Sequence, residues 1–148
     1  MAAAPVRDEI VVLLVDDDPF IREFLPLLVL RGAPPGTPLP RIEVAQAPEE
    51  ALALSGSLKA TRLVVVSDFD LKTATTGLDL LVEMARRRPD SVRILLSGHR
   101  RVELGSLVDH PEHVQCFLEK PFKLQELIAP LWQAILTGLA TRDPRQGS

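Results

Sequence analysis

Acidic, hydroxyl and basic side chains follow four separate apolar runs of this 148-residue chain. They are Asp16 and Asp17 after the first run, Asp68 after a later one, and then Ser97 and Lys120. Three carboxylates that lie close together repel one another, and a hard cation such as Mg²⁺, bound by carboxylates, waters and phosphate oxygens, offsets that repulsion. A lysine ammonium and a serine hydroxyl can each bind a phosphate oxygen. Together these groups predict phosphoryl transfer, which needs positioning and charge stabilisation more than acid–base catalysis.

The sequence argues against two other common kinds of site. No glycine-rich loop precedes a Lys-Ser or Lys-Thr pair, so the chain lacks the P-loop of nucleotide-binding proteins. The three histidines, His99, His110 and His113, have irregular spacings, and no cysteine pair accompanies them. We therefore expect solvated loop histidines rather than zinc ligands.

The apolar runs that precede the polar residues alternate with helical patterns along the chain. Strands are predicted at 9–15, 42–45, 63–67, 92–96 and 116–119. Helices are predicted at 19–31, 48–54, 77–88, 101–109 and from 123 onward. Five strand–helix pairs in succession predict an α/β domain, with a doubly wound parallel sheet that is covered on both faces. In such sheets the polar site forms beyond the carboxyl ends of the strands, where all five candidate residues would meet.

Composition narrows the class of protein further. Apolar residues make up 46% of the chain and charged residues 25%, as in a soluble domain with one core. The net charge of −3 provides no basic excess for a phosphate backbone, so we expect no direct nucleic-acid binding. The apolar runs fall far short of the ~20 residues that a membrane helix needs. The single cysteine, Cys116, suits a buried position in a cytoplasmic protein without disulfides.

Five short motifs carry a resemblance to a known family. They are Leu-Val-Asp-Asp-Asp-Pro at 14–19, Val-Val-Ser-Asp at 65–68, Gly-Leu-Asp-Leu-Leu at 77–81, Leu-Leu-Ser-Gly at 95–98 and Phe-Leu-Glu-Lys-Pro-Phe at 117–122. In this order, and close to the family's spacings, they resemble the receiver domain of bacterial two-component response regulators. The resemblance covers roughly residues 8–138, which we take as one receiver domain between an N-terminal tail at 1–7 and a flexible tail at 139–148.

The resemblance implies a role for each residue of the expected site. Asp68 matches the phosphoacceptor, which takes a phosphoryl group from a sensor histidine kinase or phosphotransfer protein. Asp16, Asp17, Asp68 and the backbone carbonyl of Asp70 match the ligands of Mg²⁺ (or Mn²⁺). Lys120 matches the lysine that pairs with the phosphoryl group. The protein would then be a phosphoacceptor in signal transduction rather than an enzyme with turnover.

The resemblance also implies how phosphorylation would be transmitted. Ser97 matches the switch hydroxyl, and Phe117 matches the switch aromatic, whose ring turns inward when the hydroxyl moves to the phosphate. Pro121 matches a proline that follows a cis peptide bond. Asp70 and His99 occupy positions that tune the lifetime of the phosphoryl group.

Fold and partners are also implied by the resemblance. The fold would be a flavodoxin-like (βα)5 sandwich with strand order 2-1-3-4-5. A downstream protein would dock on the face of the fourth helix, fifth strand and fifth helix, and a homodimer could use the fifth-helix face. Only about ten residues follow the last predicted helix, so we expect no output domain, unless the sequence is a piece of a longer regulator or hybrid kinase.

Several features depart from the family's pattern. Gly77 follows Asp68 by nine residues, one more than in the commonest form, and Lys72 stands where a proline is usual. The Gly-Ala pair that often precedes the fifth strand is absent, and a proline-rich loop at 33–40 lengthens the first helix-to-strand connection.

Two alternative functions remain open. The first is a receiver-like interaction module that is never phosphorylated, which the altered loop at 72–76 would suit. The second is a phosphatase of the haloacid-dehalogenase type, because Asp-Phe-Asp-Leu-Lys-Thr at 68–73 resembles the nucleophile loop of that family. In that family the acidic loop follows the first core strand, whereas here it follows the third, and Asp16 and Asp17 favour the receiver.

Overall fold

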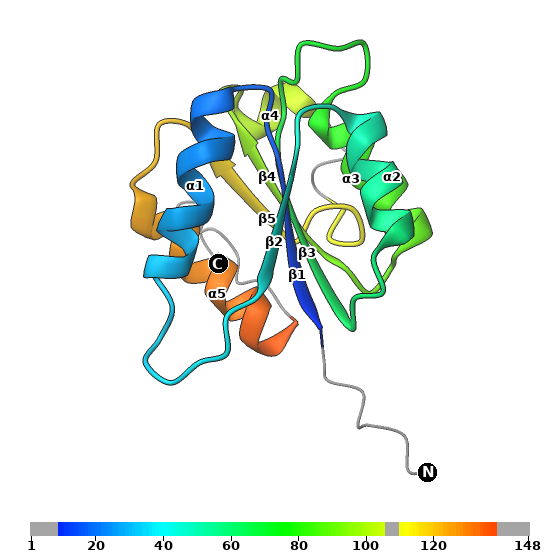
Figure 1. The fold of residues 1–148 in the computed structure, drawn as a ribbon. Helices are drawn as coiled ribbons and strands as arrows, with labels where there is room; N and C mark the ends of the chain where they lie inside the picture. Colours follow the sequence, from blue (N-terminus) through cyan, green and yellow to red (C-terminus); the bar gives the residue numbers. More distant parts are fainter. Residues whose placement is uncertain (1–8, 106–109, 139–148) are drawn as a thin grey trace.

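A computed structural model describes residues 9–105 and 110–138, which form one sheet with helices on both faces (Figure 1). The strands are β1 (Ile10–Val15), β2 (Arg41–Ala45), β3 (Arg62–Asp68), β4 (Val92–Ser97) and β5 (Cys116–Glu119). The helices are α1 (Pro19–Arg31), α2 (Pro48–Ser57), α3 (Gly77–Arg87), α4 (Arg101–Leu104) and α5 (Leu124–Thr137). The predicted tail at 1–7 and the predicted flexible tail at 139–148 lie outside the described residues.

The sheet is entirely parallel, and its order is β2-β1-β3-β4-β5, which confirms the predicted order 2-1-3-4-5. Both faces of the central strands are buried. On β1, Val11 and Leu13 belong to one hydrophobic cluster, and Val12 and Leu14 belong to a second cluster on the opposite face. This two-sided burial explains why the central strands read as continuous apolar runs without alternation.

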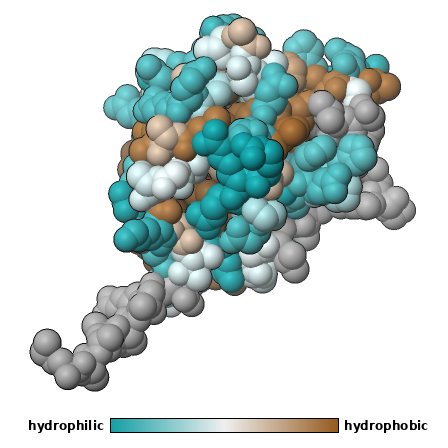
Figure 2. Space-filling view, turned by 90° about the vertical axis from the view of Figure 1, so that its right-hand side faces the viewer, coloured by the Kyte–Doolittle hydropathy of each residue, from teal (hydrophilic) through white to brown (hydrophobic). Residues whose placement is uncertain are grey.

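The helices divide between the two faces of the sheet. α1 and α5 cover one face, at the left of Figure 1, and α2 and α3 cover the other. Seen from the α2–α3 side, hydrophilic residues occupy much of the surface and hydrophobic residues show between them (Figure 2). This mixed surface is the normal exterior of amphipathic helices whose apolar stripes face a sheet.

The fourth helix is shorter than predicted where the structure describes it. We expected a helix over 101–109, but α4 ends at Leu104. Gly105 follows with φ 81°, a backbone conformation that no right-handed helix contains and that glycine adopts without a steric penalty. Residues 106–109, the remainder of the predicted helix, lie outside the described residues.

A buried arginine, which the sequence did not single out, joins the loops that precede β4 and β5. Arg93 on β4 is 2% exposed. Its guanidinium donates to the carbonyl oxygens of Ser91 at 2.7 Å, His113 at 2.8 Å and Glu112 at 2.6 Å. Burial lowers the pKa of this guanidinium. These bonds tie the chain that enters β5 to the start of β4, which fixes the two strands that end in Ser97 and Glu119.

Across 9–105 and 110–138, the structure contains no helix that is both long and apolar enough to cross a membrane.

Gly77, the first residue of α3, lies against the end of β3. Its amide donates to the carbonyl oxygen of Phe69 at 2.8 Å, which closes the loop that follows Asp68. A Cβ at residue 77 would overlap with the carbonyl oxygen of Asp68 and would lie 2.8 Å from Ser67 Oγ. Only glycine therefore allows α3 to begin this close to the end of β3.

We predict that Gly77→Ala lowers the free energy of unfolding by about 1–3 kcal/mol, because backbone or core side chains must move to admit the methyl group. Gly56→Ala is the matched control, since a Cβ at that position on α2 meets no atom within 4 Å. The control should gain about 0.5–1 kcal/mol from its higher helix propensity. Urea unfolding followed by the fluorescence of Trp132, the single, buried tryptophan, measures both changes. Equal stability of the two variants would contradict the close approach.

Candidate functional site

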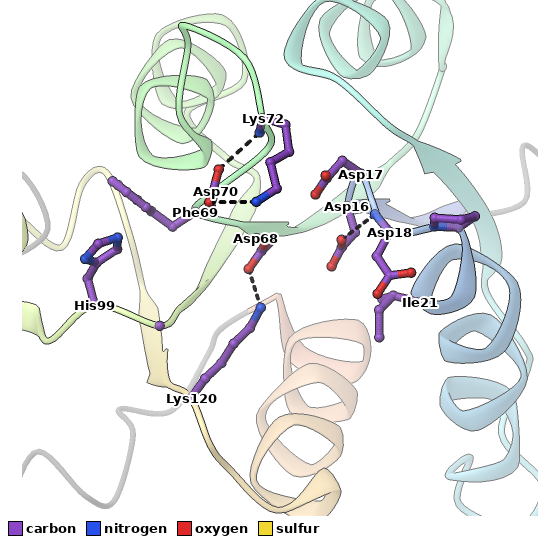
Figure 3. Close-up of a pocket in the computed structure, with 12 residues that line it drawn as sticks. Asp16, Asp17, Asp18, Ile21, Asp68, Phe69, Asp70, Lys72, His99 and Lys120 are labelled. Carbon is purple, nitrogen blue, oxygen red and sulfur yellow. Dashed lines mark hydrogen bonds and ion pairs between the residues drawn. The ribbon is translucent and has the colours of Figure 1, made fainter.

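Three carboxylates meet at the carboxyl edge of the sheet. Oxygen atoms of Asp16, Asp17 and Asp68 all lie within 4.8 Å of one another. Asp16 and Asp68 are buried and Asp17 is half-buried. They lie in an open pocket between the start of α1 and the loops after β3 and β4 (Figure 3). The structure therefore brings together the three acids that the sequence placed after two different strands.

The end of β1 and the first turn of α1 fix the acidic pair. The Asp16 amide donates to the carbonyl oxygen of Ala45 at 3.0 Å, and one Asp16 carboxylate oxygen accepts from the Asp18 amide at 2.9 Å. Asp18 then acts as the N-cap of α1, because its carboxylate accepts from the Phe20 amide at 2.9 Å. The successive acidic residues thus have different tasks, and the carboxylate of Asp18 caps the helix.

Lys120, which follows β5, reaches Asp68 at the end of β3. Its amide donates to the carbonyl oxygen of Ser97 at 2.7 Å, just past the last residue of β5. Its ammonium donates to Asp68 Oδ1 at 2.6 Å. The peptide bond between Lys120 and Pro121 is cis, as expected at this position. The Lys120 ammonium therefore contacts one of the three clustered carboxylates directly.

Burial and mutual repulsion change the acidity of the cluster. Burial, followed by the charges of Asp68 and Asp17, raises the pKa of Asp16 to about 6, against the opposing effects of the Asp18 amide and Lys120. Burial also raises the pKa of Asp68, and the hydrogen bond and charge of Lys120 act in the opposite direction. The raised pKa values mean that the charged forms of these partly buried carboxylates are poorly stabilised. A bound cation would stabilise them.

Ser97 and Phe117, the expected switch residues, lie inside the fold. Ser97 is fully buried, and its Oγ accepts a hydrogen bond from the His99 amide at 2.9 Å. The Phe117 ring is also fully buried, within the cluster under α2 and α3. The Arg101 guanidinium lies over this ring, 5.4 Å from its centroid. These contacts connect the end of β4, and the Phe117 ring on β5, to the start of α4.

Asp70 and His99 border the pocket and are exposed. The Asp70 carboxylate accepts from the Lys72 amide at 3.1 Å and from the Lys72 ammonium at 3.4 Å. These two bonds, with the charge of Lys72, lower the pKa of Asp70. The His99 ring lies edge-on to Phe69, with centroids 5.2 Å apart. Lys72 was noted in the sequence only as a departure from the family pattern, and its place beside the site was not predicted.

The acidic cluster fits the requirements of a magnesium ion. Mg²⁺ prefers oxygen ligands and is usually bound by one or two carboxylates with several waters. Asp17 and Asp68 line an open pocket, which leaves room for such waters, and Asp16 lies beside them. The residues present therefore suit the ion that the sequence predicts.

Solved structures show what the arrangement resembles. A signal receiver domain of an HD domain-containing protein from Pseudomonas fluorescens Pf-5 is 27% identical, covers 93% of this chain and 95% of its own, and has a TM-score of 0.72. A CheY-like response regulator receiver domain from Methanospirillum hungatei JF-1 is 19% identical, with coverages of 94% and 99% and a TM-score of 0.70. The chain has the fold of a response regulator receiver domain.

Another receiver neighbour carries a ligand. The response regulator TrrA from Thermotoga maritima was solved in complex with Mg²⁺-BeF, and it is 24% identical with a TM-score of 0.67, covering 83% of this chain and 96% of its own. No protein-family model matches the chain, and no curated protein matches it in sequence. The likeness to receiver domains therefore depends on three-dimensional similarity together with the motifs.

We predict that Mg²⁺ stabilises this protein through the acidic cluster. At ten times its dissociation constant, an ion that binds only the folded state adds about 1.4 kcal/mol to the free energy of unfolding. Asp17→Asn should abolish this gain, yet by relieving repulsion it should stabilise the metal-free protein by up to about 1 kcal/mol. Urea unfolding with and without Mg²⁺ measures both effects.

Asp90→Asn is the control, because Asp90 is an exposed acid in the loop between α3 and β4, at the opposite edge of the sheet. It should keep the full response to Mg²⁺. An equal loss of the response in both variants would show nonspecific screening instead of a site.

Proposed function

We propose that this receiver domain accepts a phosphoryl group on Asp68 from a sensor histidine kinase or phosphotransfer protein, and that the modification switches its contacts with other proteins. The observation that carries the proposal is the position of the Asp68 carboxylate between the acidic pair and the Lys120 ammonium. One side can hold a divalent cation, and the other presents a fixed positive charge. A phosphoryl group on Asp68 would lie between the two.

The transfer needs few groups beyond those already in place. A carboxylate oxygen of Asp68 attacks phosphorus, an O–P bond forms as the N–P bond of the donor phosphohistidine breaks, and the electron pair leaves with the imidazole nitrogen. Asp16, Asp17 and Asp68 would hold Mg²⁺, which when bound neutralises phosphoryl oxygens. Lys120 is already hydrogen-bonded to Oδ1 and can follow the new charge to a phosphoryl oxygen.

Transmission of the signal would begin at Ser97. Its Oγ accepts a hydrogen bond from the His99 amide, and its proton can be donated to a phosphoryl oxygen, which is a charged and therefore strong acceptor. A move of the hydroxyl would disturb the chain from Ser97 to α4, whose Arg101 lies over the Phe117 ring. We propose that this movement changes the conformation of the face formed by α4, β5 and α5, where Val102 is 81% exposed. The equilibrium between two packings would then be read by a partner.

The surface beside the site favours a protein donor. Phe20, Phe24 and Leu27 on α1 are 62%, 41% and 58% exposed. The two rings lie 4.4 Å apart, and the row begins two residues after Asp18 at the rim of the pocket. Contiguous exposed apolar residues mark protein interaction sites. A protein that delivers a phosphoryl group to Asp68 could dock on this row while its histidine enters the pocket.

We predict that incubation with acetyl phosphate and Mg²⁺ adds one phosphoryl group to the intact protein, as measured by mass spectrometry. Asp68→Asn should abolish the adduct, as should removal of Mg²⁺ by a chelator. Asp90→Asn is the control and should be modified like the wild type, because this aspartate lies outside the pocket.

Two results would favour the alternative functions. Steady release of phosphate without an adduct would indicate a phosphatase. The absence of both adduct and release, with a phosphorylated histidine phosphotransfer protein as well as with acetyl phosphate, would indicate an interaction module that is not phosphorylated.

A further inference from the structure

The loop after Asp68 carries a second lysine at the mouth of the pocket. Lys72 lines the pocket together with Lys120, although the two come from different parts of the fold. Lys120 follows β5, whereas Lys72 lies in the loop between β3 and α3. In Figure 3 the Lys72 ammonium lies beside the Asp70 carboxylate at the rim of the site. The pocket thus has a cation on either side of Asp68, and only Lys120 is hydrogen-bonded to it.

The loop backbone directs Lys72 toward the pocket. Leu71 is 2% exposed and anchors the chain in the core, and the bond from the Gly77 amide to the Phe69 carbonyl closes the loop behind it. Lys72 has φ 59°, and it is the one described residue other than glycine with a positive φ. Left-handed backbone is costly for a lysine, so such a conformation persists only where the surroundings impose it. The loop therefore fixes the backbone of Lys72 at the border of the pocket, within reach of which its side chain lies.

The partner of Lys72 in the unmodified protein is easily exchanged. Its ammonium lies 3.4 Å from Asp70 Oδ2, and the two side chains are 72% and 62% exposed. An exposed ion pair of this kind contributes little to stability. A phosphoryl group, by contrast, adds about two negative charges and three acceptor oxygens. The flexible four-carbon stem of lysine allows the ammonium to change partners without movement of the loop.

We propose that Lys72 is a second phosphoryl-binding cation, which pairs with Asp70 in the unmodified protein and transfers to an oxygen of the phosphoryl group on Asp68. The proposal rests on the function proposed above and adds a residue to the site. The charges favour it, because Asp16, Asp17, Asp70 and a phosphoryl group together outweigh one divalent cation and Lys120. Lys72 would reduce this excess and stabilise the phosphorylated form.

Beryllofluoride, which binds a carboxylate as a phosphoryl mimic, tests this directly. We would use fluorine NMR to measure the concentration of beryllofluoride that half-saturates the protein in excess Mg²⁺. Lys72→Asn should raise this concentration about fivefold, the effect of losing one partly exposed charged hydrogen bond. Lys72→Arg should stay within about twofold of the wild type, because it keeps the charge.

Two further variants separate charge from backbone conformation. Asparagine and glycine both tolerate positive φ, so Lys72→Asn and Lys72→Gly should lose affinity equally if the ammonium is responsible. Lys59→Asn removes the same charge before the start of β3, at the opposite end of the strand, and should bind like the wild type.

The outcomes distinguish the proposals. If the wild type binds beryllofluoride and Lys72→Asn binds it equally well, the proposed role of Lys72 is wrong while the proposed function stands. If the wild type fails to bind beryllofluoride with Mg²⁺, the proposed function falls and the role of Lys72 falls with it.

Discussion

Repulsion among three carboxylates at one edge of a parallel sheet is the constraint on which the rest of this site depends. Asp16, Asp17 and Asp68 come within 4.8 Å of one another while two of them are buried, and burial makes each charge more costly. One ammonium, from Lys120, contacts this cluster at Asp68. The site is therefore prepared for further positive charge and, through it, for a phosphoryl group.

The rigidity of the fold holds the three carboxylates close together in spite of their repulsion. Parallel strands buried on both faces fix where β1, β3, β4 and β5 end, and those ends carry the functional residues. Gly77 lets α3 start against the carbonyl of Asp68, and Arg93 fixes the chain that leads into β5. At the opposite edge, the contacts of Arg93 hold the start of β5, the strand that ends just before Lys120. Stability and function depend on the same contacts in this region.

Most of the architecture could be predicted from the sequence, because two-sided burial leaves continuous apolar strands and polar residues mark their carboxyl ends. The strand order was predictable only through resemblance to receiver domains. Side-chain partners could not be predicted, since they depend on tertiary packing: the Ser97 hydroxyl bonds to the His99 amide, and Lys72 turns back to Asp70. The end of α4 at Gly105 depends on a local φ that composition does not reveal.

Reductive trapping of the modified residue tests the central claim most directly. Borohydride converts an aspartyl phosphate to homoserine, and peptide sequencing by tandem mass spectrometry locates that residue in the chain. After incubation with a phosphoryl donor and Mg²⁺, we expect homoserine at position 68 and unmodified aspartate at positions 16, 17 and 70. Homoserine at one of those three positions, or at none of the four, would contradict the assignment of Asp68 as the acceptor.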